Sequence, residues 1–365
     1  MGYGPQDESF IHQLPRPLNE VIDADSSWSD RCYFSAHSHD GSVLLACGYG
    51  NNPNSGNAAG YAKVALADGR HWDIGVSRQC TTDRNDLSAG ALRFTCVEPL
   101  KRWTIELGPN DSGIEWELHY ESTAPMWELL PIFIKTGDEV IVDMYHIKQP
   151  ARYTGWLQID GERRSIDGYT GGRDRTFGVR VAQKIDFWVW FEANFEDRAI
   201  EAWVFESADG TVQYVDGGFT FADGRLSKRF VKFEHEIAFD GDLKRPTRAD
   251  IVFTDEDGEK FHVTAKSKNI DVTVYHGPPH RSRQERDGTG HYSFSSKDPE
   301  MLRQMESLTV SLDQLMQFEW NGMTGQGIFE ILSMGNGYMR YPNWGPLDLT
   351  YSTMSSVSYK KKDDS

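Results

Sequence analysis

The segment IVFTDEDGEKFHV, residues 251–263, contains the pattern that decides the fold class. Ile251 and Phe253 stand two residues apart before an Asp-Gly pair, and Phe261 and Val263 follow it with the same spacing. Alternation places such residues on one face of a strand, and Asp-Gly suits the positive φ angles of a tight hairpin turn. The segment therefore predicts two antiparallel strands joined by a short turn.

The same turn signal recurs along most of the chain. Asp-Gly pairs begin at residues 40, 68, 160, 167, 209, 216, 223, 240, 257 and 287, and Asn-Gly pairs at 321 and 336. Helical signals are few, and the clearest is the cap and first turn at Asp298-Pro299-Glu300. Many short strands with regularly spaced turns predict an all-β protein built of antiparallel barrels or sandwiches, with very little helix.

The length of 365 residues is too great for one ordinary β-barrel and fits two domains. Turn signals are densest between residues 209 and 224, just past the midpoint. We therefore expect an N-terminal barrel over residues 1–210. A C-terminal barrel with a polar tail is expected over residues 211–365.

Charge and composition exclude several classes of function. The formal net charge of −17 leaves no positive footprint for nucleic acid. The N-terminal segment lacks the features of a signal peptide, and the longest apolar run, 129–134, is too short to cross a bilayer. We therefore expect a soluble, cytoplasmic protein. Its four cysteines show no Cys-x-x-Cys spacing and are expected to be free thiols.

The densest polar cluster is GGRDRTFGVR, residues 171–180. Alternation places Arg173 and Arg175 on one face of the strand and Asp174 on the other. An inward Asp174 would be a desolvated proton donor, because burial disfavours the charged carboxylate. Inward arginines would instead bind a substrate carboxylate. An ion-pair network at the mouth of a barrel is the structural alternative.

Tryptophan is the second candidate source of function. Core packing accounts for these side chains most simply, whereas an aromatic-lined cavity would stabilise a cation formed by protonating an alkene. The tryptophans taken as candidate substrate contacts are Trp116, Trp188, Trp190 and Trp320. In His37-Ser-His39, the two imidazoles could share a metal, but a single His37 lining a cavity is the preferred interpretation, so no metal site is expected.

Several segments resemble one known family. Residues 172–178, GRDRTFG, resemble the G-x-R-D-[HR]-[ST]-[WF]-G signature of proteins related to the carotenoid hydratases (hydroxyneurosporene synthases). Residues 33–50, 233–236 and 318–330 are similar to the same group and stand in the same order. Phe177 occupies a signature position where Trp is more common. The resemblance implies two tandem lipocalin-like (calycin) barrels, and a ligand cavity.

The resemblance also implies a cofactor-independent enzyme acting on a hydrophobic, unsaturated small molecule such as an isoprenoid, steroid or aromatic compound. We expect a lyase of the hydratase or dehydratase type, or a cyclase or isomerase, in terpenoid or other secondary metabolism. Asp174 would donate the proton, and His37 or Tyr169 would handle the water. The alternative is a non-catalytic lipocalin-like carrier or sensor. No partner is expected beyond the small molecule and a second copy in a homodimer.

Overall fold

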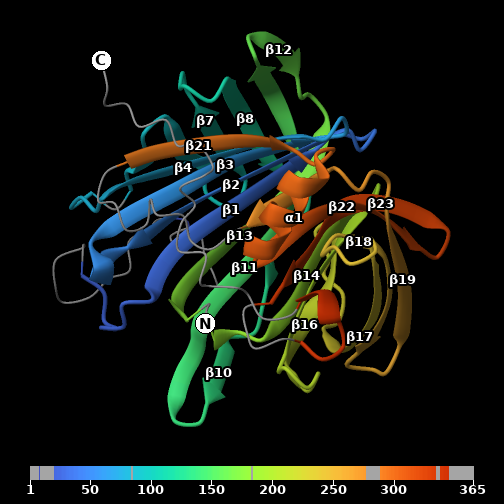
Figure 1. The fold of residues 1–365 in the computed structure, drawn as a ribbon. Coiled ribbons are helices and arrows are strands. Elements are labelled where there is room, and N and C mark those ends of the chain that lie inside the picture. Colours follow the sequence, from blue (N-terminus) through green and yellow to red (C-terminus); the bar gives the residue numbers. More distant parts are fainter. Residues whose placement is uncertain are drawn as a thin grey trace.

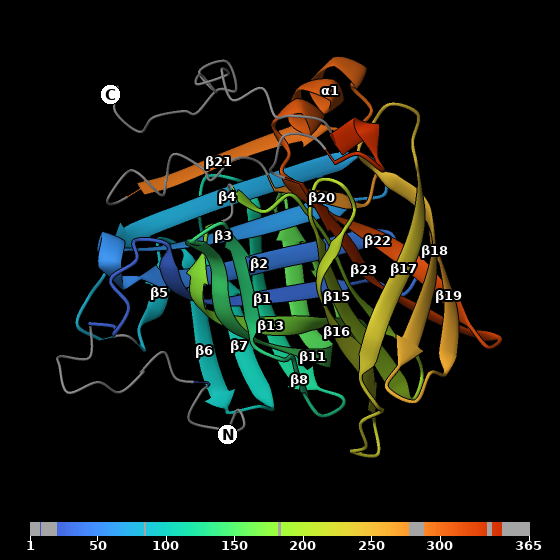
Figure 2. The same ribbon diagram turned by 90° about the horizontal axis from the view of Figure 1, so that it is seen from below.

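Two curled antiparallel β-sheets form most of the computed structural model and give it the shape of two adjoining barrels (Figures 1 and 2). The structure describes residues 8, 20–83, 85–181, 184–276, 288–333 and 338–344. The two lipocalin-like barrels expected from the sequence are confirmed.

The first sheet contains strands from the first half of the chain and one late strand. Its main path runs in the order β21-β4-β3-β2-β1-β13-β11-β8-β7-β6-β5, and β9, β10 and β12 pair with β11. The bounds are β1 Trp28–His37, β2 Val43–Asn52, β3 Asn57–Leu66, β4 Arg70–Gln79, β5 Leu87–Ala89, β6 Leu92–Glu98, β7 Arg102–Leu107, β8 Ile114–Ser122, β9 Trp127–Glu128, β10 Ile132–Thr136, β11 Glu139–Ile159, β12 Glu162–Ser165, β13 Tyr169–Arg180 and β21 Gly288–Ser295.

The second sheet follows the order β16-β15-β14-β23-β22-β19-β18-β17, and β20 pairs with β22. Its outer strands curve around in Figure 2 so that the sheet closes on itself almost completely. The bounds are β14 Phe187–Asn194, β15 Arg198–Glu206, β16 Val212–Phe221, β17 Phe230–Phe239, β18 Pro246–Asp255, β19 Lys260–Ser267, β20 Thr273–His276, β22 Ser311–Trp320 and β23 Met323–Leu332.

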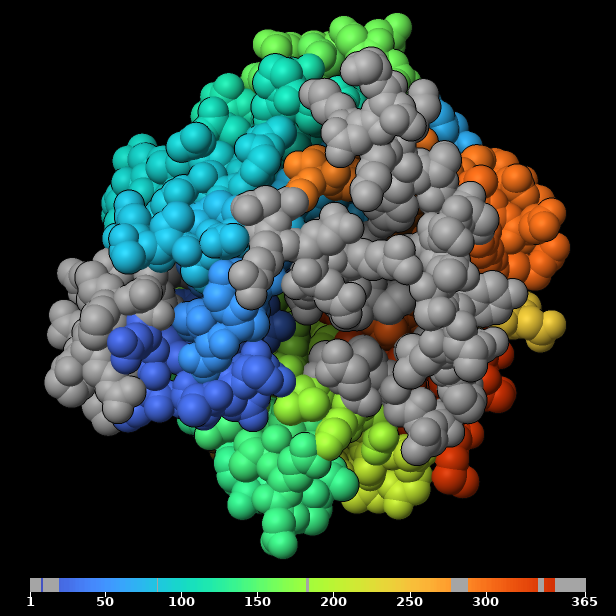
Figure 3. Space-filling view, turned by 60° about the vertical axis from the view of Figure 1, so that its left-hand side comes forward, coloured from blue at the N-terminus to red at the C-terminus, as the bar shows by residue number. Residues whose placement is uncertain are grey.

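One α-helix, α1 (Pro299–Leu308), occurs among the described residues, where the sequence predicts it. The Asp298 side chain accepts hydrogen bonds from the backbone N–H groups of Glu300 and Met301, as an N-cap does. Two short 3₁₀ turns, η2 (Pro53–Ser55) and η5 (Pro342–Trp344), also occur in the described part of the chain. The helix lies beside the end of the second sheet and is seen in orange at the edge of the space-filling view (Figure 3).

Most of the buried apolar residues in the described part of the chain belong to three large clusters. One fills the first barrel and includes Trp116, and one fills the second barrel and includes Trp320. The third lies between the sheets and contains Trp188, Trp190 and Trp203. This division follows from strand alternation, because β14 and β15 direct one set of side chains into their own barrel and the other set toward the first sheet.

The two sheets divide the chain differently from the expected boundary at residue 210. Strands β14 and β15 precede that residue but belong to the second sheet, and β21 returns from the second half to pair with β4 in the first. The aromatic strand at 187–194 is β14, and it begins the second sheet because its backbone pairs with β15 and β23. The four cysteines are free thiols, as predicted, with Cys32 and Cys47 buried.

Candidate active site

Asp174 lies on the outer face of the first barrel, turned toward the second sheet. Its neighbours Arg173 and Arg175 are fully buried on the opposite face of β13. The Asp174 side chain keeps 19% of its surface accessible. The strand alternation expected from the sequence is thus present, but the acid faces the space between the barrels rather than the interior of one barrel.

A row of polar and aromatic side chains runs across the first sheet through the position of Asp174. Tyr33 on β1 and Lys148 on β11 are the two residues directly opposite Asp174 in the strand register. Beyond Tyr33 the row continues through Gly48 on β2 to Tyr61 on β3. A Cβ atom on Gly48 would lie 2.8 Å from the Tyr61 ring, so glycine is what allows the ring to lie over β2.

A second row crosses the facing sheet. Trp203 on β15 stands opposite Trp190 on β14, and Trp190 stands opposite Glu330 on β23. Glu330 in turn stands opposite Asp313 on β22. Two carboxyl groups and two indole rings are therefore presented to the row that contains Asp174.

Contacts between the two rows bring them into one site. The Lys148 Nζ atom lies 3.9 Å from the centroid of the Trp190 ring and 5.3 Å from that of Trp203. Tyr33 packs edge-on against Trp190, with ring centroids 5.8 Å apart, and its hydroxyl donates a 2.7 Å hydrogen bond to Asp313 Oδ2. The site is thus built from strands of both sheets.

Burial raises the pKa of Asp174 to about 6, while the positive charges of Lys148, Arg180 and Arg31 act in the opposite direction. His146 Nε2 lies 3.8 Å from Asp174 Oδ2. Burial holds the pKa of His146 well below its usual value, so this ring is neutral near pH 7. Asp174 is therefore a carboxylic acid that can carry or release its proton close to neutral pH.

Burial also controls the charges around Lys148. It lowers the pKa of Lys148 to about 7, against the attraction of Glu201, Asp174, Glu192 and Glu330. Glu192 and Glu201 stand directly opposite each other on β14 and β15, both almost fully buried. Burial raises the pKa of both, and Glu192 Oε1 accepts a 2.8 Å hydrogen bond from the Ser35 hydroxyl.

The two arginines of the 171–180 segment lie apart from this site. Arg173 forms an ion pair with Glu8 and also donates hydrogen bonds to Gln149 inside the first barrel. Arg175 forms a fully buried ion pair with Asp30. Both guanidinium groups are thus bound to carboxylates of the chain itself, which corresponds to the structural alternative considered for this segment.

The other candidate residues are divided among different places. Trp188 and Trp190 join Asp174 in the site, and the Trp188 Nε1–H donates a 3.2 Å hydrogen bond to Glu330. Trp116 and Trp320 lie in the separate barrel cores. They are packing residues at those positions.

His37 and Tyr169 do not lie beside Asp174. His37 is four residues along β1 from Tyr33, which corresponds to about 13 Å, and burial lowers its pKa to about 3. Tyr169 is half-buried against the core of the first barrel, where burial raises its pKa. Among the described residues, no group of three or more His, Cys, Asp or Glu side chains could hold a metal ion.

Most of the polar residues of the site were not among the candidates named from the sequence, although they share one recognisable feature. They are charged residues inside otherwise apolar strands, which is unusual unless the charge has a partner. The residues concerned are Lys148, Glu192, Glu201, Asp313 and Glu330.

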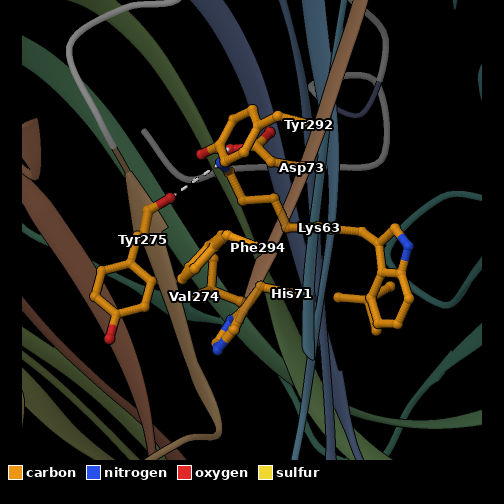
Figure 4. A pocket seen from close by; sticks show the side chains of 9 residues that line it. Lys63, His71, Asp73, Val274, Tyr275, Tyr292 and Phe294 are labelled. Atoms are coloured by element: carbon orange, nitrogen blue, oxygen red, sulfur yellow. Dashed lines mark hydrogen bonds and ion pairs between the residues drawn. The ribbon is translucent and has the colours of Figure 1, made fainter. Parts of the chain in front are cut away.

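A separate small pocket lies where β20 and β21 meet β3 and β4 (Figure 4). Lys63 binds Asp73 and donates a 3.0 Å hydrogen bond to the Tyr275 carbonyl, and the Tyr292 hydroxyl donates a 2.7 Å bond to Asp73. His71 stacks on Phe294 with ring centroids 4.3 Å apart. These contacts join β3, β4 and β21 of the first sheet to one another and to β20 of the second sheet, and we assign the pocket a structural role.

The fold and the two facing rows define a two-barrel lipocalin-like protein with a polar, tryptophan-lined site between its sheets. The structure of a Nitrosomonas europaea protein provisionally assigned as AttH is similar, with a TM-score of 0.58 and 14% identity over 89% of this chain and 97% of that one. The structure of kievitone hydratase from Nectria haematococca is similar with a TM-score of 0.55 and 14% identity, over 87% of this chain and 92% of that one. At this identity the likeness establishes the fold.

The chain belongs to the DUF8625 family, a family of unknown function whose model matches residues 4–341. None of the curated proteins matches the sequence. No helix of the described residues is both long and apolar enough to pass through a membrane.

Proposed function

We propose that this protein is an acid–base enzyme that adds water to, or removes it from, a hydrophobic unsaturated small molecule. A related cyclisation or isomerisation would use the same first step. The observation that carries the proposal is Asp174, an acid with a pKa raised to about 6 and a partly accessible side chain. Its two cross-strand neighbours, Tyr33 and Lys148, both contact the Trp190 ring. The similarity in fold to a kievitone hydratase supports the reaction class by analogy only.

In the proposed reaction, the protonated Asp174 carboxyl gives its proton to a carbon of a C=C bond or to a leaving hydroxyl. Positioned acid catalysis of this kind contributes about 10²–10⁴-fold to a rate. Indole faces stabilise positive charge, but the Lys148 ammonium already lies over Trp190. A second positive charge about 5 Å away would be opposed by roughly 3 kcal/mol at an effective dielectric constant of 20. We therefore propose that water attack accompanies the proton transfer.

Substrate discovery and the role of Asp174 can be tested together. The wild-type protein, Asp174→Asn and the exposed control Asp143→Asn would each be incubated with a lipophilic metabolite extract in H₂¹⁸O. Mass spectrometry would then look for compounds that gain or lose one water. The proposal predicts conversion by the wild type and by Asp143→Asn, and a loss of about 10²-fold or more in Asp174→Asn.

The same experiment decides between an enzyme and a carrier. A carrier would hold a compound that is released unchanged on denaturation, in equal amounts from the wild type and from Asp174→Asn. That result, with no labelled product, would replace the catalytic proposal by a binding function.

A further inference from the structure

Asp313 holds two side chains from other strands on a single oxygen atom. Its Oδ2 accepts the 2.7 Å hydrogen bond from Tyr33 of the first sheet and lies 2.9 Å from His276 Nε2 of β20. The Asp313 side chain is 1% exposed. A buried carboxylate bonded to one ring nitrogen fixes the tautomer and orientation of the imidazole, so that Nε2 carries the proton and Nδ1 is an acceptor.

His276 has the exposure expected of a reacting group rather than of a core residue. Its side chain is 19% accessible, the same value as that of Asp174. The Tyr61 ring packs edge-on against the imidazole, with centroids 5.6 Å apart, and limits its rotation. Among the residues that the structure describes, Asp313 is the hydrogen-bond partner of the ring.

Tyr33 connects this pair to the acid. Its backbone position is directly opposite that of Asp174 on β13, and its hydroxyl is bonded to Asp313. Side chains at directly opposite positions have Cβ atoms about 4.5–5.5 Å apart. The proton donor and the Asp313–His276 pair therefore lie on either side of one tyrosine.

From this arrangement we propose that His276 is the general base of the reaction and that Asp313 is its positioning residue. The inference rests on the proposed hydratase function. In the hydration direction, Asp174 transfers its proton to one alkene carbon, and the oxygen of a water molecule bonds to the other. His276 Nδ1 takes the proton that this water loses, and return of that proton to Asp174 restores the starting state. Dehydration follows the same steps in reverse.

The kinetic test uses the converted compound found with the wild type. His276→Ala should lower kcat by about 10²-fold or more with KM little changed, and added imidazole should restore part of the lost rate. Asp313→Asn should also lower kcat. Added imidazole should not restore the rate of this variant, because the His276 side chain is still present. The control is His119→Ala, which removes an exposed histidine on β8.

His276→Asn keeps a polar side chain of similar reach and guards against a folding defect in the alanine variant. Folding of each variant is checked by thermal unfolding. Imidazole rescue of folded His276→Ala supports the base role. A folded His276→Ala or His276→Asn that keeps kcat within about twofold of the control overturns it.

A second measurement needs no substrate and separates this inference from the proposed function. In the wild type, ¹⁵N NMR of the histidine rings should show His276 as the Nε2–H tautomer, with the signal assigned by its loss in His276→Asn. Asp313→Asn should shift that signal. If no compound is converted but the tautomer is found, the proposed reaction fails while the oriented imidazole stands. The Nδ1–H tautomer contradicts the inference whatever the outcome of the metabolite screen.

Discussion

Lys148 and Asp174 lie directly opposite each other on β11 and β13, and burial moves their pKa values toward each other, to about 7 and about 6. A difference of about one pKa unit means that the state with the proton on Lys148 and the state with the proton on Asp174 differ in free energy by about 1.4 kcal/mol. Each group also favours the charged form of the other. The pair can therefore change its protonation state near neutral pH at low cost, which is a property suited to acid–base catalysis.

Replacing Lys148 by Met should raise the pKa of Asp174 further, because the Lys148 ammonium is the strongest of the charges that favour the carboxylate. The limb of the pH–rate profile that reports the acid should then move to higher pH by about one unit. The matched control is Lys184→Met, which removes an exposed lysine. An unchanged profile in folded Lys148→Met would show that the two groups are not coupled.

The stability of the protein should depend on pH through Glu192, whose pKa rises from 4.5 to about 7 on burial. Between these values the folded state binds more protons than the unfolded state, so the contribution of Glu192 is fully present below pH 4.5 and is lost as the pH rises through 7. Glu192→Gln mimics the protonated group and can still accept the Ser35 hydrogen bond.

Urea unfolding should therefore give Glu192→Gln and the wild type similar free energies of unfolding near pH 4.5. Above pH 7 the variant should be more stable by on the order of 1–3 kcal/mol. Glu121→Gln, an exposed position on β8, is the control. Parallel curves for the wild type and Glu192→Gln from pH 4.5 to 8 would contradict the raised pKa.

Much of the fold was predictable from sequence because it depends on local chemistry. Most Asp-Gly pairs of the described residues lie at turns, and Asp298 specifies the start of α1 through its own side chain. The turn expected at Asp216-Gly217 is wrong, because this pair lies inside β16, and the pairs at 287 and 336 are not fully within the described residues. Strand alternation likewise predicts that Asp174 lies on the opposite face of β13 from Arg173 and Arg175, as the structure shows. Strand pairing is not local, so the return of β21 to the first sheet could not be read from residues 288–295 alone.

The site was only partly predictable for the same reason. Asp174, Trp188 and Trp190 could be named as candidates because a polar motif and an aromatic strand are visible in the sequence. Asp313 and Lys148 are single charges in apolar strands, and their meeting depends on which strand lies opposite which. The position of His37 relative to Asp174 depends on the strand register, in which His37 stands opposite Thr170 and Asp174 opposite Tyr33.

Tyr33→Phe should destabilise the protein by about 1–3 kcal/mol, because it removes a donor from the buried Asp313 carboxylate. Tyr49→Phe is the control, since within the described part of the chain the Tyr49 hydroxyl makes two long contacts of 3.4 Å, both to backbone oxygens. Denaturant unfolding measures both variants. Equal losses in the two would show that the hydrogen bond between the sheets contributes nothing.

Gly172→Ala should also be destabilising, by about 1–3 kcal/mol. An added Cβ would collide with the Glu192 carboxyl and lie 2.9 Å from the Gln149 carbonyl oxygen. Gly108→Ala, where the added Cβ meets only the Ala91 oxygen at 3.7 Å, should cost much less. If thermal unfolding ranks the two substitutions the other way, the close approach of the two sheets at Gly172 is not present in solution.

The protonation of Asp174 is the property on which the catalytic account depends, and it can be measured directly. A ¹³C NMR titration of the aspartate carboxyl groups, with the Asp174 signal assigned by its loss in Asp174→Asn, reports the pKa of this group in the folded protein. The account predicts a midpoint of about 6. A midpoint at or below the ordinary aspartate value of about 3.9 would contradict it, because the carboxyl would then hold no proton to donate near neutral pH.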